Sequence, residues 1–242
     1  MNFEIFNNRK VICGVTDSSH GSFGSFKNLD VSKKLLKIIN LQNITEKNLV
    51  FARQVHGDKV HRCLKGEHGQ VKQNADALVT QNKNQILVIK TADCVPILLY
   101  EPRKKVVAAI HAGRKSLIKR IISKTINEMI KNYRISPKYL KAFIGPHIRK
   151  DDYDLKAKIL KKLNKLSWNK YLSERNGKTY FDLTAAATDE LENGGVLENN
   201  IRDCKICTFC DYKRYYSARR REANPAIYDH KFPCFVSYIG MI

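Results

Sequence analysis

The sequence predicts a mixed α/β (α+β) fold, in which β-sheets pack against flanking helices within a single domain covering residues 1–242. Apolar runs of strand length recur along the chain, and amphipathic stripes of helical period lie between them. Neither a repeat nor a linker rich in Pro, Gly or Ser divides the sequence. Interleaved strands and helices are typical of sheets covered by helices, and a chain of 242 residues buries enough surface to fold as one unit.

Seven segments are expected to form strands. Many of them are continuous apolar runs, which are typical of strands covered on both faces. Between two of these runs, residues 101–104 contain Pro102 and predict a hairpin turn. The predicted strands are residues 11–16, 48–54, 77–80, 86–90, 95–100, 106–111 and 140–144.

Three segments are expected to form helices. In the clearest, apolar residues recur at spacings of three and four over residues 117–133, a stripe that must face a core, and Pro137 lies beyond its end. The second covers residues 155–166, where a row of lysines predicts a solvated face in preference to a nucleic-acid surface. The third covers residues 182–195, with an aspartate at its N-cap and two glycines at its end.

The chain is strongly basic, with 44 Lys and Arg against 23 Asp and Glu, a net charge of +21 and a pI of about 9.7. Such a field attracts polyanions. The basic residues are mostly lysines spread over the whole chain, and Asn and Ile are also abundant, as an AT-rich genome would produce. We therefore expect compositional bias and no nucleic-acid partner, with a polyanion partner as the alternative.

The composition also bears on cellular location. The first residues lack an apolar stretch long enough for a signal peptide, and the longest apolar runs are far shorter than the roughly 20 residues of a membrane span. Seven cysteines, an odd number, indicate reduced thiols. We expect a cytoplasmic protein with no membrane association.

Candidate catalytic residues lie where predicted strands end. His56 closes one strand, Cys94 lies between two, and His111 ends another just before a helix. Spacings of 38 and 17 residues differ from the close ligand pairs of a structural zinc knuckle, and they are typical of a catalytic site in which the fold gathers three ligands and leaves a fourth position for water. Two imidazoles and a thiolate suit Zn²⁺ or copper. The alternative is three independently packed side chains.

Eight short motifs extend this pattern over nearly the whole chain. In order they are residues 54–57 (QVHG), 75–80 (ADALVT), 91–96 (TADCVP), 111–113 (HAG), 144–146 (IGP), 181–183 (FDL), 207–208 (CT) and 215–220 (YYSARR). With them the sequence resembles the laccase-domain, or polyphenol-oxidase-like, family. That family is associated with purine nucleoside phosphorolysis and adenosine deamination, and its bacterial members are also called peptidoglycan editing factors.

The resemblance implies that His56, Cys94 and His111 jointly hold a zinc ion and are the catalytic residues. It also implies an αββα-like sandwich. The expected activity is that of a zinc-dependent purine nucleoside phosphorylase acting on adenosine and inosine, with methylthioadenosine as a further candidate, together with adenosine deaminase activity. The expected partners are thus a purine nucleoside and phosphate.

Basic residues in or near the motifs are expected to bind the phosphate, to which the arginine guanidinium is well suited. They are Arg114 and Lys115 after the His-Ala-Gly motif, and Arg219 and Arg220 near the C-terminus. The sequence departs from the family here, because Arg114, Lys115 and Ser116 stand where the family usually has Trp-Arg-Gly. The Thr-Gly-Arg that usually follows Arg220 is also absent.

Other candidate residues are expected to have lesser roles. Cys204, Cys207 and Cys210 have a paired spacing that could indicate a second metal, but a fourth ligand does not lie nearby in the sequence and we expect none. Asp76 is expected to be structural, whereas Asp93 is expected to orient a ligand histidine. Surface or packing roles are expected for His20, His61, His68, His147 and His230.

Three alternative functions remain open. Cys94 could be the nucleophile of a cysteine hydrolase or amidase with a histidine base, or the chain could be a basic binding protein without catalysis. Copper-dependent polyphenol oxidation is the third. A multicopper oxidase needs about ten histidines, many in His-x-His pairs, whereas this sequence has seven histidines and no such pair. A single copper in the triad remains possible in vitro, because Cu²⁺ outcompetes Zn²⁺ at such ligands.

Overall fold

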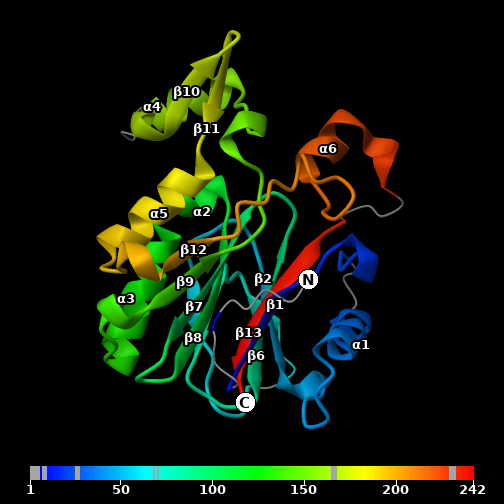
Figure 1. Cartoon of the computed structure of the whole chain (residues 1–242), viewed down its shortest axis with the longest axis vertical. Coiled ribbons are helices and arrows are strands. Elements are labelled where there is room, and N and C mark those ends of the chain that lie inside the picture. The colour runs from blue at the N-terminus through cyan, green and yellow to red at the C-terminus, as the bar shows by residue number, and fades with distance from the viewer. Residues whose placement is uncertain are drawn as a thin grey trace.

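Two β-sheets lie face to face at the centre of the computed structural model, which describes residues 6, 10–24, 28–67, 69, 71–164, 168–228 and 233–242. One sheet has six strands in the order β12-β9-β7-β8-β5-β3, and the other has five in the order β1-β13-β6-β2-β4 (Figure 1). Strands β10 and β11 form a separate antiparallel pair.

The strands are β1 Val11–Val15, β2 Leu49–Arg53, β3 Val60–Arg62, β4 Val71–Gln73, β5 Ala77–Thr80, β6 Gln85–Thr91, β7 Val95–Glu101, β8 Val106–Ala112, β9 Lys141–Ile144, β10 Leu172–Arg175, β11 Lys178–Phe181, β12 Ile201–Asp203 and β13 Phe235–Met241. The helices are α1 Asn28–Ile39, α2 Arg114–Ile118, α3 Ile121–Tyr133, α4 Ala157–Asn164, α5 Leu183–Asn193 and α6 Ala218–Ala223.

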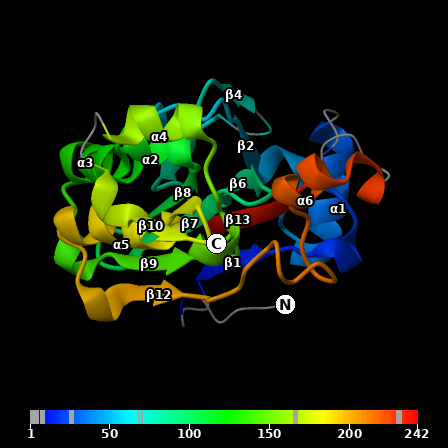
Figure 2. The same cartoon turned by 90° about the horizontal axis from the view of Figure 1, so that it is seen from above.

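Helices cover the outer face of each sheet, so the layers follow the order helix, sheet, sheet, helix. α2, α3 and α5 pack on the six-stranded sheet, and α1 packs on the five-stranded sheet. Figure 2 shows α3 and α5 on one side of the sheets and α1 on the other. This arrangement confirms the predicted mixed α/β class and the αββα-like sandwich.

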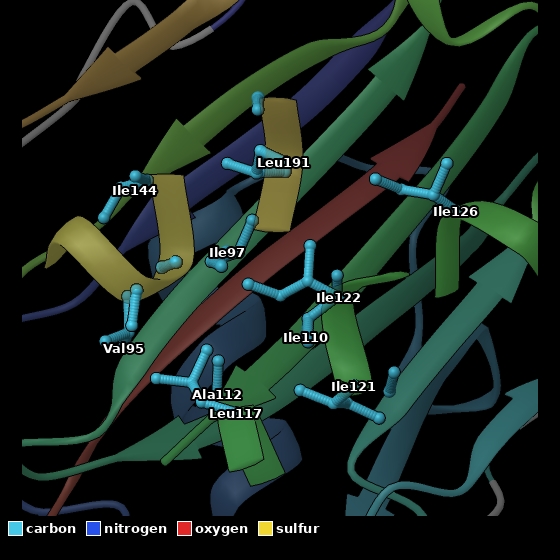
Figure 3. Close-up of a cluster of buried hydrophobic side chains, with 14 of the residues drawn as sticks. Val95, Ile97, Ile110, Ala112, Leu117, Ile121, Ile122, Ile126, Ile144 and Leu191 are labelled. Carbon is cyan, nitrogen blue, oxygen red and sulfur yellow. The ribbon is translucent and has the colours of Figure 1, made fainter. Parts of the chain in front are cut away.

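Strand β7 shows why the central strands are continuous apolar runs. Ile97 and Leu99 pack into the core beneath the helices, where Ile97 lies close to Ile122 of α3 (Figure 3), whereas Leu98 and Tyr100 point into the core between the sheets. Because successive side chains of a strand point to opposite faces, a strand covered on both sides needs apolar residues at every position. Each fully buried aliphatic side chain contributes roughly 1.5–3 kcal/mol to folding.

All seven predicted strands are present, and no end is shifted by more than one residue. The predicted hairpin turn joins β7 to β8, whose antiparallel register pairs Glu101 with Val106. Strands β3, β4 and β10 to β13 and helices α1 and α6 were not predicted from the sequence. The most important of these is β13, because it lies between β1 and β6. It was not predicted because Ser237 and Gly240 interrupt its apolar run.

The clearest predicted helix is two helices, so that prediction was wrong in part. α2 ends at Ile118, and α3 begins after Arg120, whose backbone is left-handed with a φ of 63°. Both helices face the same sheet, and the apolar period therefore continues across the break. The buried carboxylate of Glu190 in α5 accepts hydrogen bonds from the Ser123 amide and hydroxyl, which satisfies donors in the first turn of α3.

The other two predicted helices are present. α4 covers residues 157–164, and the predicted continuation to Leu166 lies outside the described residues. α5 begins as predicted, since the Asp182 carboxylate accepts from the Ala185 amide at 2.9 Å, and it ends at Asn193, directly before Gly194. Among the described residues, no helix combines the length and the apolar character needed to cross a membrane.

Candidate functional site

Three strand ends bring His56, Cys94 and His111 together, and we call this group the triad. His56 follows β2, Cys94 precedes β7, and His111 lies at the end of β8. One ligand atom from each lies within 4.8 Å of the other two. The Cys94 Sγ atom is 3.7 Å from His56 Nε2, and the two imidazole centroids are 4.8 Å apart. His111 is buried, Cys94 half-buried and His56 exposed, so the triad opens to solvent on the His56 side.

The buried carboxylate of Asp76 organises two members of the triad. It accepts hydrogen bonds from the backbone amides of Val55, His56 and Gly57 at 3.2, 2.9 and 2.8 Å. It also lies 2.8 Å from His111 Nδ1, which leaves Nε2 of that ring to face the triad. Burial alone would raise the pKa of Asp76, but the His111 ring and the three amides hold it below its usual value.

Asp93 fixes the loop that carries Cys94. Its buried carboxylate accepts from the Thr208 hydroxyl at 2.6 Å, the Ser217 hydroxyl at 2.9 Å and the Arg219 amide at 2.7 Å, while burial raises its pKa. Among the described residues, these are its hydrogen-bond donors, and neither histidine of the triad is one of them. The predicted roles of the two aspartates were therefore wrong, since Asp76 orients a histidine and Asp93 does not.

Gly113 makes room for the triad. A Cβ atom at this position would lie 2.8 Å from Cys94 Sγ and 3.1 Å from the His56 ring. Real Cβ atoms essentially never lie within 3.0 Å of a heavy atom, so a side chain here would displace Cys94 and crowd the His56 ring. The glycine of the His-Ala-Gly motif is thus required by close approach.

The triad is electrostatically coupled. Burial alone would raise the pKa of Cys94, but the neighbouring His111 and His56 imidazoles lower it to about 6. Burial alone would lower the pKa of His111, but the Cys94 thiolate and the Asp76 carboxylate raise it to about 9. At neutral pH the thiol therefore favours its thiolate form, which is the form that binds metals and acts as a nucleophile.

Two of the predicted phosphate-binding residues flank Tyr153, a residue that the sequence analysis did not identify. Arg114 Nε donates to the Tyr153 hydroxyl at 3.3 Å, and the Arg219 guanidinium carbon lies 5.3 Å from the centre of the Tyr153 ring. Arg219 also forms an ion pair with Asp154. Because Arg114 begins α2 only three residues after His111, it is carried close to the triad.

The other two predicted phosphate-binding residues have different surroundings. Lys115 is exposed in the first turn of α2. Arg220 is buried, and its guanidinium donates to the backbone carbonyls of Thr208, Phe209 and Tyr215. These bonds stabilise the chain around residues 208–220, and this placement does not favour the predicted role of Arg220 in phosphate binding.

A cleft of about 670 Å³ adjoins the triad on the His56 side. Cationic residues line it and were not predicted as site residues; they are Arg53, Lys90 and Arg221. The side-chain amide of Gln54, another lining residue, pairs with the Lys90 backbone, donating to its carbonyl at 2.6 Å and accepting from its amide at 2.8 Å. This pairing fixes the end of β2, from which His56 projects.

The remaining histidines fit the surface and packing roles expected of them where they are described. His20 lies beside Asp17, and His61 beside Glu67. His147 is buried, with its ring nitrogens 2.8 Å from the Gly145 carbonyl and the Thr184 hydroxyl. His68 and His230 lie outside the described residues.

The family of the chain follows from comparison with known proteins. A family model described as "Multi-copper polyphenol oxidoreductase laccase" matches residues 27–225, most of the chain. The chain belongs to this laccase family. The match confirms the resemblance drawn from the eight motifs. The crystal structure of the Bacillus licheniformis hypothetical protein YfiH has a TM-score of 0.83 at 23% identity, covering 96% of this chain and 93% of that one, and it shares the fold.

Two relatives of this laccase-family chain carry names that refer to nucleosides. One, named purine nucleoside phosphorylase and from Bacteroides thetaiotaomicron, is 29% identical over 168 residues, covering 68% of this chain. The match spans only 62% of that relative's length. The other, Adenosine deaminase RL5 from an unknown prokaryotic organism, is 31% identical over 188 residues, covering 73% of this chain and 71% of the relative.

The laccase-family description points to a bound metal, and the donor chemistry of the triad fits one. The triad offers two imidazole nitrogens and a thiolate, a set that suits Zn²⁺ or copper. Asp76 supplies the outer hydrogen bond that metal-binding histidines generally have. The described residues contain a second candidate group, in which one carboxylate oxygen of Asp152 lies 3.1 Å from Cys207 Sγ and 2.9 Å from Cys210 Sγ.

Proposed function

We propose that the chain is a zinc-dependent purine nucleoside phosphorylase that acts on adenosine and inosine and also deaminates adenosine. Methylthioadenosine is a further candidate substrate. The observation that carries the proposal is the convergence of His56, Cys94 and His111 at the edge of a cleft lined by cationic groups. The names of the two relatives support the substrate class.

The zinc ligands in this proposal are Nε2 of His56, Sγ of Cys94 and Nε2 of His111. A zinc ion bound there supplies Lewis-acid chemistry and lowers the pKa of a bound water. The protein holds the three donors in place. Asp76 fixes both histidines, and Gly113 leaves room for them to approach Cys94. Cys94 contributes a negative charge, since its thiolate is favoured at neutral pH.

The adjoining cleft is the proposed nucleoside site. Its volume of about 670 Å³ lies within the usual range of small-molecule pockets. Phe51, Ala52 and Val71 line it with apolar surface on which a purine can pack, while Arg53 and Lys90 supply hydrogen-bond donors for polar atoms of the ligand.

Arg114 and Arg219, on either side of Tyr153, are the proposed phosphate-binding residues, with Lys115 adding positive charge nearby. Since Arg114 donates to the Tyr153 oxygen, the hydrogen of that hydroxyl can be donated to an anion. In phosphorolysis a phosphate oxygen forms a bond to the anomeric carbon of the ribose while the bond to the purine nitrogen breaks, and the base leaves as it gains a proton. In deamination, water replaces the amino group at C6 of adenine and ammonia leaves.

The decisive test is chromatography of the reaction of purified protein with inosine or adenosine, with and without inorganic phosphate. We expect hypoxanthine release from inosine only when phosphate is present, and inosine formation from adenosine without it. Equal base release in phosphate-free buffer would show hydrolysis and overturn the phosphorylase proposal.

One observation favours a second candidate, a cysteine hydrolase or amidase. The pKa of Cys94 near 6, with two imidazoles beside it, is also typical of a nucleophilic cysteine. Metal content separates the two candidates. A Cys94→Asp variant that keeps zinc and part of the activity supports the metal proposal, because zinc accepts carboxylate oxygen. A substrate adduct on Cys94 in the wild-type protein supports the hydrolase.

A further inference from the structure

A second convergence of metal-ligating side chains lies outside the triad. The thiols of Cys207 and Cys210 both donate to the same oxygen of Asp152, at 3.1 and 2.9 Å. The three ligand atoms lie within 4.8 Å of one another, and the cysteine pair has the C-x-x-C spacing common in zinc sites. The third member of the group is Asp152 and not Cys204. Asp152 lies 55 residues before Cys207, which is why the cysteine spacing alone did not reveal it.

The backbone around these residues is held in place before any ligand binds. On one side, the Asp152 amide donates to the Arg149 carbonyl, and Arg149 forms an ion pair with Asp203 at 2.7 Å. On the other side, the Thr208 amide donates to the His147 carbonyl at 3.0 Å, which fixes the start of the cysteine loop. A site whose ligands are already positioned loses less conformational entropy when it binds an ion.

We propose that Asp152, Cys207 and Cys210 form a second metal site, which takes a thiophilic divalent cation of the zinc class. Two thiolates and a carboxylate are donors that Zn²⁺ accepts, and they would exchange their weak S–H hydrogen bonds for metal–ligand bonds. Cys210 is exposed and the other two are half-buried, so the cation can enter from solvent, and water completes its coordination. Binding releases the two thiol protons.

The site would act as a clamp between two segments that reach the triad. Asp152 directly precedes Tyr153, which contacts Arg114 and Arg219. Thr208, inside the cysteine loop, donates to Asp93 beside Cys94. A cation at the second site therefore joins the Tyr153 side of the candidate active site to the loop that positions Cys94. The two sites differ in their ligands, so each can be removed without mutating the other.

The test measures zinc content, and the Co²⁺ absorption spectrum, of purified full-length protein. In a variant that lacks the triad ligands, His56→Ala/Cys94→Ala/His111→Ala, we expect about one equivalent of zinc and a thiolate-to-cobalt charge-transfer band. Adding Cys207→Ser and Cys210→Ser should remove both signals. Cys204→Ser is the matched control, because this neighbouring cysteine packs against the core between the sheets, and it should change neither signal.

Two results would overturn the proposal. One is less than about a tenth of an equivalent of zinc, with no thiolate-to-cobalt band, in the folded triad variant. The other is a Cys207–Cys210 disulfide in the protein as purified, with no metal bound. If the triad variant fails to fold, Asp152→Asn in the otherwise wild-type protein decides, because it preserves side-chain shape. The proposal then requires that zinc fall from about two equivalents to about one.

Discussion

Cys94 and Cys210 each belong to a group of three potential metal ligands, yet the charges beside them are opposite. Cys94 is the less exposed of the two, and its burial favours the neutral thiol, but two imidazoles lower its pKa to about 6. Cys210 is exposed, and the Asp152 carboxylate raises its pKa to about 12. The charge of the neighbouring side chains, more than solvent access, therefore decides which thiol ionises in the metal-free protein.

Alanine substitutions in the triad should have the largest effect, and they test whether the triad is the catalytic group. His56→Ala, Cys94→Ala and His111→Ala should each lower phosphorolysis by about a thousandfold or more and lose the triad zinc, because the metal needs all three donors. The proteins should remain folded by circular dichroism, since a core of this size does not depend on the metal. The matched control is His61→Ala, which removes a histidine that contacts Glu67 outside the triad. A Cys94→Ala protein with full zinc and no activity would contradict the assignment.

The contrast between the two thiols can be measured directly by alkylation of metal-stripped protein. The thiolate fraction of Cys94 should rise with pH through a midpoint near 6, whereas Cys210 ionises only near 12. At pH 7, iodoacetamide should label Cys94 at least about a hundredfold faster than Cys210, even though low-pKa thiolates are weaker nucleophiles. Peptide mass spectrometry measures both rates. Asp152→Asn should accelerate labelling of Cys210 and leave the labelling rate of Cys94 unchanged. Equal rates in the wild type would contradict the difference in pKa between the two thiols.

A smaller effect is expected for Asp76, whose carboxylate affects zinc binding only through the His111 ring. Asp76→Asn should weaken zinc binding at the triad by about 10- to 100-fold, because the hydrogen bond that orients His111 is weakened while the shape of the side chain is kept. Competition with a chromophoric chelator measures the affinity. Asp189→Asn, which alters a surface carboxylate paired with Lys170, is the control and should bind zinc normally. An unchanged affinity in Asp76→Asn would show that the backbone alone positions His111.

Glu190 differs from both cysteines, because burial outweighs the effect of neighbouring groups on its pKa. Burial raises its pKa to about 7, against the lowering effects of Ser123 and Arg120, and its Oε1 atom has no hydrogen-bond partner among the residues that the structure describes. A carboxyl group whose pKa is raised in the folded state binds its proton more tightly there, so stability falls as the pH rises from about 4.5 through 7.

Glu190→Gln removes that titration and still offers an oxygen to Ser123. We expect the variant to be more stable than wild type by about 1–2 kcal/mol at pH 8, with the advantage disappearing near pH 4.5. Urea unfolding at the two pH values measures it. A wild-type protein whose stability relative to the variant does not change with pH would contradict the raised pKa.

The apolar runs of the sequence predicted the central strands because these strands are buried on both faces, as β7 and β8 are. The triad was predictable because its three members lie at the ends of predicted strands, where a sheet can bring distant residues together. The role of Asp76 was not predictable, since it depends on the left-handed backbone of His56, with a φ of 55°, in a turn that directs three amides at one carboxylate. Asp152 ends a short 3₁₀ helix, Lys150–Asp152, and Tyr153 follows it. Both lie outside the quoted motifs, so their contacts appear only in three dimensions.

The position of β13 has a consequence for the order of folding during synthesis. This strand pairs with β1 on one side and β6 on the other, joining segments that lie more than 200 residues apart in the case of β1 and β13. The six-stranded sheet needs only residues 60–203, so a ribosome can release all of its strands while the other sheet still lacks the strand that joins β1 to β6. Until β13 emerges, the edges of β1 and β6 that it will occupy are unpaired. Such edges bind other extended chains, so we expect the chain to be most prone to incorrect strand pairing at this late stage.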